Sequence, residues 1–342
     1  MKILIYSGPF YPKVGGMETT SLILAQQFHL AGNEVKLITV TPGNTNSDRQ
    51  HFAYEVLRNP SLWKMLILIW ECDIFFHKGI SLKAFWPIVF FRRKFVVMHE
   101  TWYSRDHNGK KGWQDQLKLF ICRYIVNVAI SKSIAQRIPA KSYVIPNPYE
   151  SRIFTKIEGI LRNKELIFLG RIVSDKGVDI LLSALFLLKK RNITPVLSIV
   201  GEGPEKDSLL FQAKQLKIVD QIQFMGLKKG KELVNILNEH QILVVPSKWP
   251  EPFGIVSLEG IACGCVVVGS EQGGLKDAIG SCGVTFPNGN AEKLAETLYL
   301  LLTDQTKLLA CRNNASFHLK NHSEEHIASL YLTIFKDLVN QN

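Results

Sequence analysis

The stretch Glu165-Leu-Ile-Phe-Leu-Gly-Arg-Ile-Val-Ser-Asp-Lys-Gly177 is the part of the chain from which the fold is inferred. An apolar run, Glu165–Gly170, ends in a polar loop, and a helical pattern, Gly177–Lys190, begins directly after it. The first is typical of a buried strand and the second of a covering helix. This order predicts one unit of a parallel sheet covered by helices.

The same order recurs on both sides of this stretch. The N-terminal series comprises predicted strands at Lys2–Ser7, Glu34–Val40, Asp73–His77, Phe95–Met98, Tyr124–Ile130 and Ser142–Ile145, with a helix at Thr19–Leu30. The C-terminal series adds strands at Val196–Gly201, Gln221–Met225, Gln241–Val245 and Cys265–Gly269, with a helix at Pro204–Leu216. The break at Pro146-Asn147-Pro148 and a predicted linker, Tyr149–Asn163, separate the two series. We therefore expect an α/β protein with two Rossmann-like domains whose parallel sheets face each other across a cleft.

The expected domains are residues 1–153 and residues 154–321. Residues 322–342 are predicted to form a C-terminal helix that packs back on the N-terminal domain. One helical face of that segment is apolar, with Ile327, Leu330, Tyr331, Ile334, Phe335 and Leu338.

The composition is that of an ordinary globular protein, with 46% hydrophobic and 21% charged residues. No apolar run approaches the roughly 20 residues that span a bilayer, and the N-terminal run Ile3–Tyr6 is too short for a signal peptide. We therefore expect a cytoplasmic protein. Its six cysteines predict no disulfide framework, and Cys263 and Cys265 are interpreted as small buried thiols rather than metal ligands.

Positive charge is concentrated in the N-terminal half. Residues 1–160 hold 21 Lys and Arg against 11 Asp and Glu, a net of +10, and the other 182 residues carry a net of +1. Such a bias predicts an anionic partner for this half, either a membrane surface or a nucleic acid.

The most specific motif is Glu251-Pro-Phe-Gly-Ile-Val-Ser-Leu-Glu259, which follows the predicted strand ending at Val245. Pro252 suits the first position of a helix, and the N–H groups of Phe253, Gly254 and Ile255 would then form an anion site. Glu259 would lie one turn further on the same side, where a carboxylate accepts the hydroxyls of a ribose. The structural alternative is a helix with an acidic cap and a surface glutamate.

The second motif is Gly170-Arg171 to Lys176-Gly177, at the carboxyl end of a predicted strand. The guanidinium of Arg171 offers a rigid fork of donors and Lys176 a compact charge, and together they suit a diphosphate. The alternative is a pair of routine solvated charges before a helix.

Weaker signals lie at other strand ends. Gly15-Gly16 follows the first strand and opens a helix, so it is a candidate backbone cradle for an anion, although glycine pairs are common in loops. His99 directly follows an apolar strand and should face the cleft, although a lone histidine is more often structural. Gly201 begins a strand-to-helix turn that would lie behind a nucleotide base.

These motifs together resemble the retaining glycosyltransferases of the two-Rossmann (GT-B) type, in particular family four. The resemblance rests on Gly15-Gly16-x-Glu18, His99-Glu100, Ser131-x-Ser133, Pro146-Asn147, Gly170-Arg171 to Lys176-Gly177, Gly201-x-Gly203-Pro204, Glu251 to Glu259 and Gly273-Gly274. It implies an N-terminal acceptor domain and a C-terminal domain that binds a nucleotide-sugar donor. Two positions depart from the family pattern. The family usually has Asp where this sequence has Glu100, and Glu where it has Asp277.

The resemblance also implies roles for single residues. Arg171 and Lys176 would neutralise the diphosphate leaving group, while Glu251 would bind the donor sugar and Glu259 the ribose. His99 would sit by the anomeric carbon. The remaining expected donor-binding positions are Gly15, Gly16, Gly201, Phe253, Gly254 and Ile255.

The predicted reaction transfers a sugar from a UDP- or GDP-sugar, with retention, to a glycan or lipid-linked acceptor in polysaccharide, lipopolysaccharide or glycolipid synthesis. No Asp-x-Asp element is present in the sequence, so we expect no metal and no cofactor besides the donor as co-substrate. The alternatives are a nucleotide-sugar epimerase of the same fold and a non-catalytic basic protein that binds nucleic acid or a membrane. No recognised nucleic-acid motif accompanies the basic residues, which disfavours a nucleic-acid partner.

Two mixed segments favour peripheral attachment to the cytoplasmic membrane. The first, Leu62–Ile67, includes Trp63, and the second, Phe85–Lys94, combines an aromatic run with three cations. Tryptophan partitions to the membrane interface and cations to anionic headgroups. The candidate membrane contacts are Trp63, Trp86, Arg92, Arg93 and Lys94. The alternative is a core helix with a solvated end.

Overall fold

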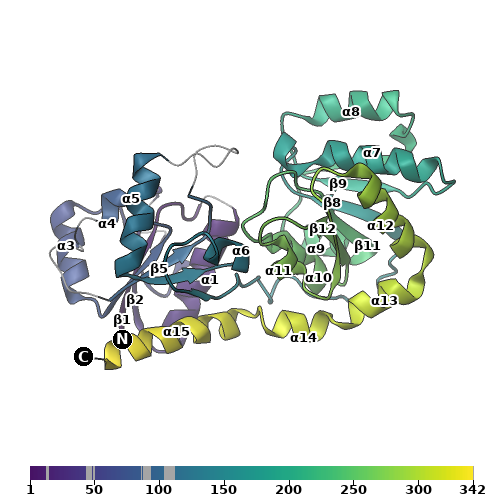
Figure 1. Cartoon of the computed structure of the whole chain (residues 1–342). Helices are drawn as coiled ribbons and strands as arrows, with labels where there is room; N and C mark the ends of the chain where they lie inside the picture. The colour runs from purple at the N-terminus through teal and green to yellow at the C-terminus, as the bar shows by residue number, and fades with distance from the viewer. Residues whose placement is uncertain are drawn as a thin grey trace. The chain divides into compact units, whose positions relative to one another are not determined.

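The structure is a computed structural model that describes residues 1–12, 15–43, 48, 51–85, 87, 94–103 and 112–341, apart from the side chains of Lys83 and Lys94. The chain forms two compact units (Figure 1). Unit 1 comprises Met1–Pro148 and Ser323–Asn342, and unit 2 comprises Tyr149–His322. The predicted boundaries, 153/154 and 321/322, thus differ by a few residues from those of the structure.

Unit 1 is built on a seven-stranded sheet in the order β3-β2-β1-β4-β5-β6-β7, with parallel neighbours. Its strands are β1 (Lys2–Ser7), β2 (Glu34–Thr39), β3 (Glu55–Arg58), β4 (Ile74–Lys78), β5 (Lys94–His99), β6 (Val126–Ala129) and β7 (Ser142–Val144). The sequence pattern missed β3, a short edge strand in which only Val56 is buried. The central strands are continuous apolar runs because helices cover both faces of the sheet.

The helices of unit 1 divide between the two faces of its sheet. They are α1 (Gly16–Leu30), α3 (Leu62–Glu71), α4 (Leu82–Phe85), α5 (Trp113–Ile121), α6 (Lys132–Ala135) and α15 (Glu324–Asn340). The step from β1 to β2 runs across the sheet in one direction, and the steps from β3 to β4 and from β5 to β6 run in the other. Right-handed crossovers therefore place α1 on one face, and α3 and α5 on the opposite face.

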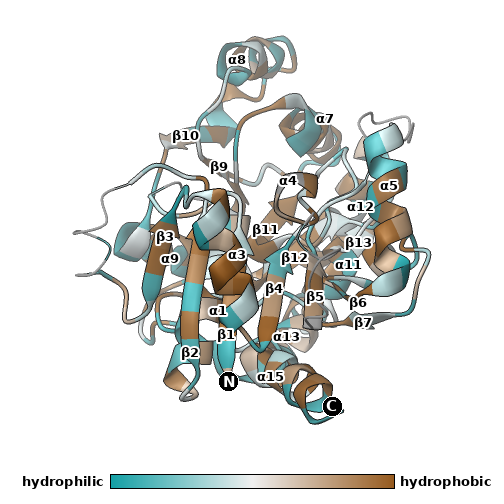
Figure 2. Cartoon of the chain, turned by 90° about the vertical axis from the view of Figure 1, so that its left-hand side faces the viewer, coloured by the Kyte–Doolittle hydropathy of each residue, from teal (hydrophilic) through white to brown (hydrophobic). Residues whose placement is uncertain are grey.

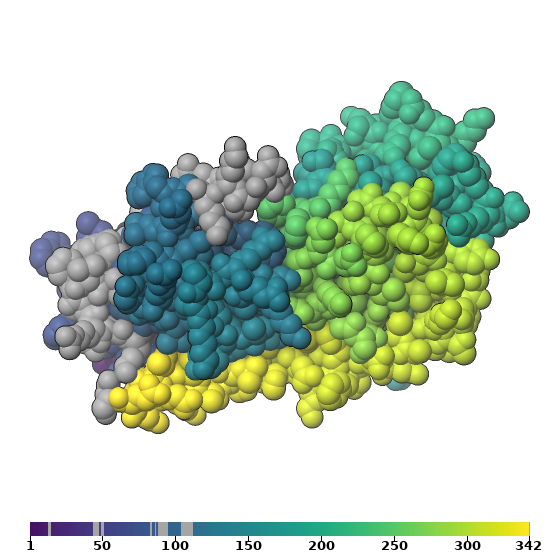
Figure 3. Space-filling view, in the orientation of Figure 1, coloured from purple at the N-terminus to yellow at the C-terminus, as the bar shows by residue number. Residues whose placement is uncertain are grey.

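The C-terminal helix α15 packs against α1 (Figure 1). In the space-filling view its yellow atoms lie against the blue atoms of the same unit (Figure 3). The contact is aromatic: the rings of Tyr331 and Phe335 lie 5.1 and 5.5 Å from Phe76, and that of Phe335 lies 5.4 Å from Phe28. Because all four side chains are buried, α15 is part of the core of unit 1.

Unit 2 contains a six-stranded parallel sheet in the order β10-β9-β8-β11-β12-β13. Its strands are β8 (Lys164–Leu169), β9 (Leu197–Val200), β10 (Ile222–Gly226), β11 (His240–Val245), β12 (Val266–Ser270) and β13 (Gly283–Phe286). Its α-helices are α7 (Val178–Lys189), α8 (Lys206–Gln215), α9 (Gly230–Glu239), α10 (Ile255–Ala262), α11 (Leu275–Ile279), α12 (Ala291–Thr303), α13 (Gln305–Asn313) and α14 (Ala315–Lys320). The edge strand β13 was not predicted. The fold class and the parallel sheets are confirmed.

The segment predicted as a linker, Tyr149–Asn163, belongs to unit 2 and is bound to the rest of that unit by side-chain hydrogen bonds. The Asn238 side chain accepts the N–H of Ile157 at 2.8 Å and donates to the carbonyl of Thr155 at 3.0 Å. These bonds need polar partners far along the chain, so the local sequence gave no sign of them.

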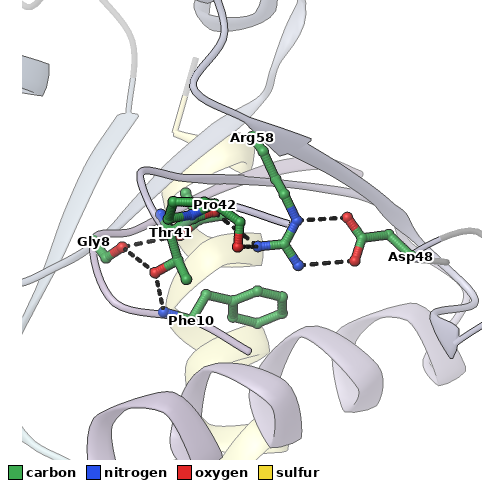
Figure 4. Close-up of polar contacts among 7 residues, drawn as sticks. Gly8, Phe10, Thr41, Pro42, Asp48 and Arg58 are labelled. Carbon is green, nitrogen blue, oxygen red and sulfur yellow. Dashed lines mark hydrogen bonds and ion pairs between the residues drawn. The ribbon is translucent and has the colours of Figure 1, made fainter. Parts of the chain in front are cut away.

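A buried arginine connects the loops at the carboxyl ends of β1, β2 and β3 in unit 1 (Figure 4). The guanidinium of Arg58 donates to both carboxylate oxygens of Asp48, at 2.6 and 2.8 Å, and also to the carbonyls of Thr41 and Pro42. The Thr41 hydroxyl in turn accepts the N–H of Phe10 at 3.0 Å. Because the side chains of Arg58 and Asp48 are only 6% and 4% exposed, the pair is shielded from solvent.

Replacing Asp48→Asn should destabilise unit 1 strongly, because it leaves the Arg58 cation buried without its counter-charge. Removing one partner of a buried pair costs about 3–5 kcal/mol. The control is Asp73→Asn, which changes a carboxylate that accepts the N–H of Lys2 at an exposed site, where the expected loss is below about 1 kcal/mol. Urea denaturation measures both, and equal losses in the two variants would contradict a structural role for the Arg58 contact.

Candidate donor site

The carboxyl ends of β8 and β11 meet at the centre of the unit 2 sheet. The chain order reverses there, since β9 lies on one side of β8 and β11 on the other. A crevice forms outside the strands at such a switch point, and open α/β sheets bind ligands in it. The loops that border it are the two that carry the specific motifs of the sequence.

Lys176 and Glu251 come together at this point, although they are 75 residues apart. The Lys176 Nζ lies 2.5 Å from Glu251 Oε1, and the Ser247 hydroxyl donates to the same oxygen at 2.7 Å. The two charged side chains remain 22% and 13% exposed, so a ligand can reach them. Ser247 was not predicted, because a lone serine in a loop carries no pattern.

The two loops interlock through backbone contacts. The carbonyl of Asp175 accepts the N–H groups of Lys248 and Trp249, at 2.9 and 3.3 Å. Gly177 has a left-handed φ of 69°, and a Cβ atom there would overlap the carbonyl oxygen of Pro246. A glycine is therefore required for the loop of Lys176 to approach the loop of Glu251.

Helix α10 begins at Ile255 rather than at Pro252, so the predicted helix start is wrong. Gly254 precedes the helix with a φ of 98°, a conformation that prevents the helix from starting earlier. Phe253 is buried. The backbone of Glu251 is held from the other side, where its carbonyl accepts the N–H of Gly274 at 2.7 Å.

Glu259 lies on α10, one turn after Ile255, as predicted. Its side chain is partly buried, and this burial, with a smaller effect of the nearby Glu150, raises the pKa of Glu259 to about 7. The carboxyl group thus changes charge near neutral pH, well above the usual range for glutamate.

Arg171 lies two residues after the end of β8 and is exposed, and it forms none of the ion pairs found among the described residues. The turn after it is fixed because the Ile172 N–H donates to the Glu202 carbonyl at 2.8 Å. Gly201, at the end of β9, allows the neighbouring chain to approach, since a Cβ there would overlap the Gly170 carbonyl oxygen. The loops after β8 and β9 therefore form one packed edge.

In unit 1, Gly15 and Gly16 begin α1, three residues earlier than predicted. Gly15 is the N-cap, and its carbonyl accepts the N–H of Thr19 at 2.9 Å. A Cβ on Gly15 would contact the Glu18 carboxylate. The pair thus occupies a helix start, where the first N–H groups have no helical partner.

His99 lies at the end of β5 and is fully buried, with both ring nitrogens engaged within unit 1. The Asn127 amide nitrogen donates to the carbonyls of Cys122 and Ile125, so its amide oxygen, 3.0 Å from Nε2, must accept a hydrogen bond from the Nε2–H of His99. Nδ1 then accepts from the Tyr103 hydroxyl at 2.6 Å. Burial lowers the pKa of His99 to about 4, so the imidazole is neutral. The partners Tyr103 and Asn127 were not predicted.

The candidate membrane contacts are only partly described. Trp63 on α3 is 77% exposed. Trp86, Arg92 and Arg93 lie outside the described residues, as does the side chain of Lys94, which begins β5. None of the helices in the described part of the chain is both long and apolar enough to cross a bilayer.

Comparisons with known proteins support the fold seen in the structure. Residues 151–317, almost all of unit 2, match the family model described as "Glycosyl transferases group 1". The whole chain superposes on a crystal structure of Anabaena Alr3699/HepE in complex with UDP, with a TM-score of 0.82 at 19% identity, covering 98% of this chain and 100% of that one. The chain therefore has the fold of the GT-B glycosyltransferases.

Curated relatives are similar over part of their length. A glycogen synthase of Mycobacterium tuberculosis is 34% identical over 142 residues, which is 41% of this chain and 34% of that protein. A D-inositol 3-phosphate glycosyltransferase of Rhodococcus erythropolis is 31% identical over 185 residues, 51% of this chain and 42% of that protein. The chain thus matches about a third to two fifths of the length of these relatives.

Replacing Gly177→Ala should damage the donor site more than an alanine at another left-handed glycine. Gly289 is the matched control, because its φ of 73° is similar but no atom lies within 4 Å of an added Cβ. Both variants should lose about 1–2 kcal/mol of stability from backbone strain, and Gly177→Ala should lose more because of the overlap with Pro246. Calorimetric melting compares them, and identical melting temperatures would show that the two loops do not need this close approach.

Proposed function

We propose that this protein transfers a sugar from a nucleotide-sugar donor, which binds at the carboxyl edge of the unit 2 sheet. The observation that carries the proposal is the Lys176–Glu251–Ser247 cluster at the switch point, inside the segment that matches the glycosyltransferase family model. UDP-glucose is the first donor to test, because Alr3699/HepE has also been crystallised with UDP-glucose.

The proposed chemistry depends on stabilising the leaving nucleoside diphosphate. Arg171 is exposed at the crevice. Lys176 can leave Glu251 and bind a phosphate oxygen instead, because a diphosphate carries more negative charge than a carboxylate. Preorganised cations lower the barrier where negative charge develops. We propose that the two cations do this without a metal ion. Since we identify no carboxylate nucleophile among the described residues of unit 1, we also propose that the acceptor attacks from the face that the diphosphate leaves, with retention.

Two glutamates would hold the donor at opposite ends. Once Lys176 moves, Glu251 is free to accept hydroxyls of the donor sugar, while Ser247 keeps its carboxylate in place. Glu259, when ionised, would accept both ribose hydroxyls. We propose that His99 lies beside the donor sugar as a neutral residue and makes no hydrogen bond to it, because Asn127 and Tyr103 occupy both of its ring nitrogens.

We further propose that unit 1 rests on an anionic membrane and receives a lipid-linked acceptor of glycolipid, lipopolysaccharide or polysaccharide synthesis. Helix α3, whose ribbon is mostly in the hydrophobic colour of Figure 2, buries Met65, Leu68 and Ile69 and leaves other apolar side chains exposed. Helix α5, on the same face of the sheet, also exposes apolar side chains along one side. The exposed residues are Leu62, Trp63, Ile67 and Trp70 on α3 and Trp113, Leu117 and Phe120 on α5. Exposed apolar patches of this kind mark interaction sites, and the excess of cations in residues 1–160 suits an anionic surface.

Replacing Arg171→Ala or Lys176→Ala should lower kcat by about 10²–10³-fold, because each removes a group from the developing diphosphate charge. The assay follows UDP release from UDP-glucose in excess EDTA, which also tests metal independence. The control is Lys228→Ala, a lysine paired with Glu232 in the same unit. Full activity of Lys176→Ala would remove this assignment, and activity that returns only with magnesium or manganese would contradict the metal-free mechanism.

The affinity for UDP-glucose should fall as the pH decreases from 8 to 6, because protonated Glu259 can no longer accept two hydroxyls. With a pKa of about 7, the ionised fraction and hence the affinity fall by up to about tenfold over this range. The diphosphate of UDP-glucose keeps its charge in this interval. Calorimetric titration of wild type and Glu259→Gln gives the comparison, and the variant should bind more weakly and without this pH dependence. A wild-type affinity that is constant between pH 6 and 8 would exclude the ribose role of Glu259.

In flotation with vesicles that contain anionic lipid, wild type should rise with the vesicles at low salt and be released at high salt. The double variant Trp63→Ser/Trp70→Ser should float less, because it loses two interfacial anchors. The control is Phe211→Ser/Phe317→Ser in unit 2, where Phe317 is as exposed as Trp63, at 77%. If wild type does not float with the vesicles at low salt, the proposal of membrane attachment fails, and a soluble acceptor is to be proposed instead of a lipid-linked one.

A further inference from the structure

Two histidines at the end of unit 2, His318 and His322, pack against the elements that hold the loop of Glu251. We call residues 247–254 the donor loop. His318 lies on α14, and His322 follows it by four residues, which is one helical turn. Helix α14 packs against α10, which begins where the donor loop ends (Figure 1). His318 is partly buried and His322 is only 6% exposed.

The ring of His318 closes the carboxyl end of α11. Its Nε2 lies 2.8 Å from the carbonyl oxygen of Ala278, and since a carbonyl can only accept, Nε2 carries the proton and donates. That carbonyl belongs to the last turn of a helix, where the carbonyl groups lack intrahelical donors. Gly280, the C-cap residue of α11, permits the approach, because a Cβ there would overlap the His318 ring. The imidazole therefore supplies a donor that the end of α11 lacks.

The other end of α11 holds the donor loop. The N–H of Gly274, the N-cap residue of α11, donates to the carbonyl of Glu251 at 2.7 Å. Leu275, the first residue of the helix, packs so closely under Gly254 that a Cβ added to Gly254 would overlap its side chain. Since α11 has five residues, it is only about 7.5 Å long. A displacement at its carboxyl end is therefore transmitted to the backbone of Glu251.

His322 contacts the donor loop directly. Its ring centroid lies 6.1 Å from that of Phe253 and 4.4 Å from that of His318. The His322 Nδ1 also donates to the His318 carbonyl at 2.9 Å, which fixes the orientation of the ring. Phe253 is 2% exposed and lies two residues after Glu251. The three rings thus form a continuous contact from α14 to the donor loop.

These contacts fix the backbone of Glu251, whereas its carboxylate is partly exposed at the crevice. A side chain that binds a ligand needs such support, because a displacement of about 1 Å removes much of its interaction. An apolar side chain in place of His318 would fill similar space but would leave the Ala278 carbonyl without its donor. The expected consequence is a shift of α11 and of the loop that rests on it.

We propose that His318 and His322 are positioning residues for Glu251. They hold α11 and Phe253 so that the Glu251 carboxylate stays where it meets the donor sugar. This inference rests on the proposed function, and it concerns unit 2 alone.

The test is the variant His318→Leu, with the dissociation constant of UDP-glucose measured by calorimetric titration. It should bind UDP-glucose at least about fivefold more weakly than wild type, and His322→Ala should change the affinity in the same direction. His318→Gln should keep most of the wild-type affinity, because its amide nitrogen can also donate to the Ala278 carbonyl.

His240→Leu is the matched control. His240 is buried and donates from its ring to the carbonyl of Ile236 at 2.6 Å, but it begins β11 at the amino edge of the sheet, away from the donor loop. This variant should lose stability, with a dissociation constant within about twofold of wild type. If it weakens UDP-glucose binding as much as His318→Leu does, general destabilisation explains both and the inference is overturned.

A double-mutant cycle shows whether His318 acts through Glu251. Glu251→Gln alone should weaken UDP-glucose binding, and His318→Leu should weaken it by less than about twofold further, because the group that His318 positions is already changed. Effects that multiply in the double variant, or a wild-type affinity in His318→Leu, overturn the inference. If wild type does not bind UDP-glucose, or if Glu251→Gln binds it as wild type does, the proposed function fails first, and the two failures are distinguishable.

Discussion

The contact between the Lys176 ammonium and the Glu251 carboxylate organises unit 2 around the ends of β8 and β11. It forms because parallel strands bring their carboxyl ends to one edge, and because Gly177 lets one loop approach the Pro246 carbonyl of the other. The cation and the anion are held at 2.5 Å yet remain partly exposed, and we propose that they bind a ligand that carries both phosphates and hydroxyls. The remaining features of the site, from Ser247 to the Gly274 N–H, keep this pair in place.

Most of the fold follows from the sequence because buried parallel strands are apolar runs and end at polar loops. The strands that escaped prediction, β3 and β13, are edge strands of four residues with few buried side chains. The start of α10 was missed for a different reason. Pro252 satisfies the local rule for a helix start, but Gly254 has a left-handed φ of 98°, and a Cβ atom added there would overlap the Leu275 side chain.

The candidate site residues could be named from the sequence because polar side chains after the carboxyl ends of parallel strands often bind ligands. Arg171, Lys176 and Glu251 follow from that rule, and Glu259 follows from its spacing along the next helix. The Lys176–Glu251 contact could not be predicted, because it depends on loops 75 residues apart. The sequence named His99 as a candidate, but it did not predict that the imidazole is neutral, because the hydrogen-bond partners Tyr103 and Asn127 belong to no motif.

The central claim is that the unit 2 crevice binds a nucleotide sugar, and ligand-dependent thermal unfolding tests it most directly. We expect one of the UDP-, GDP- and ADP-glucose donors to raise the melting temperature of wild type, and at 100 times its dissociation constant to stabilise it by about 2.7 kcal/mol. The same donor should give little or no shift with Glu251→Gln/Glu259→Gln. A wild-type protein whose melting is unchanged by every nucleotide sugar at millimolar concentration would contradict the account.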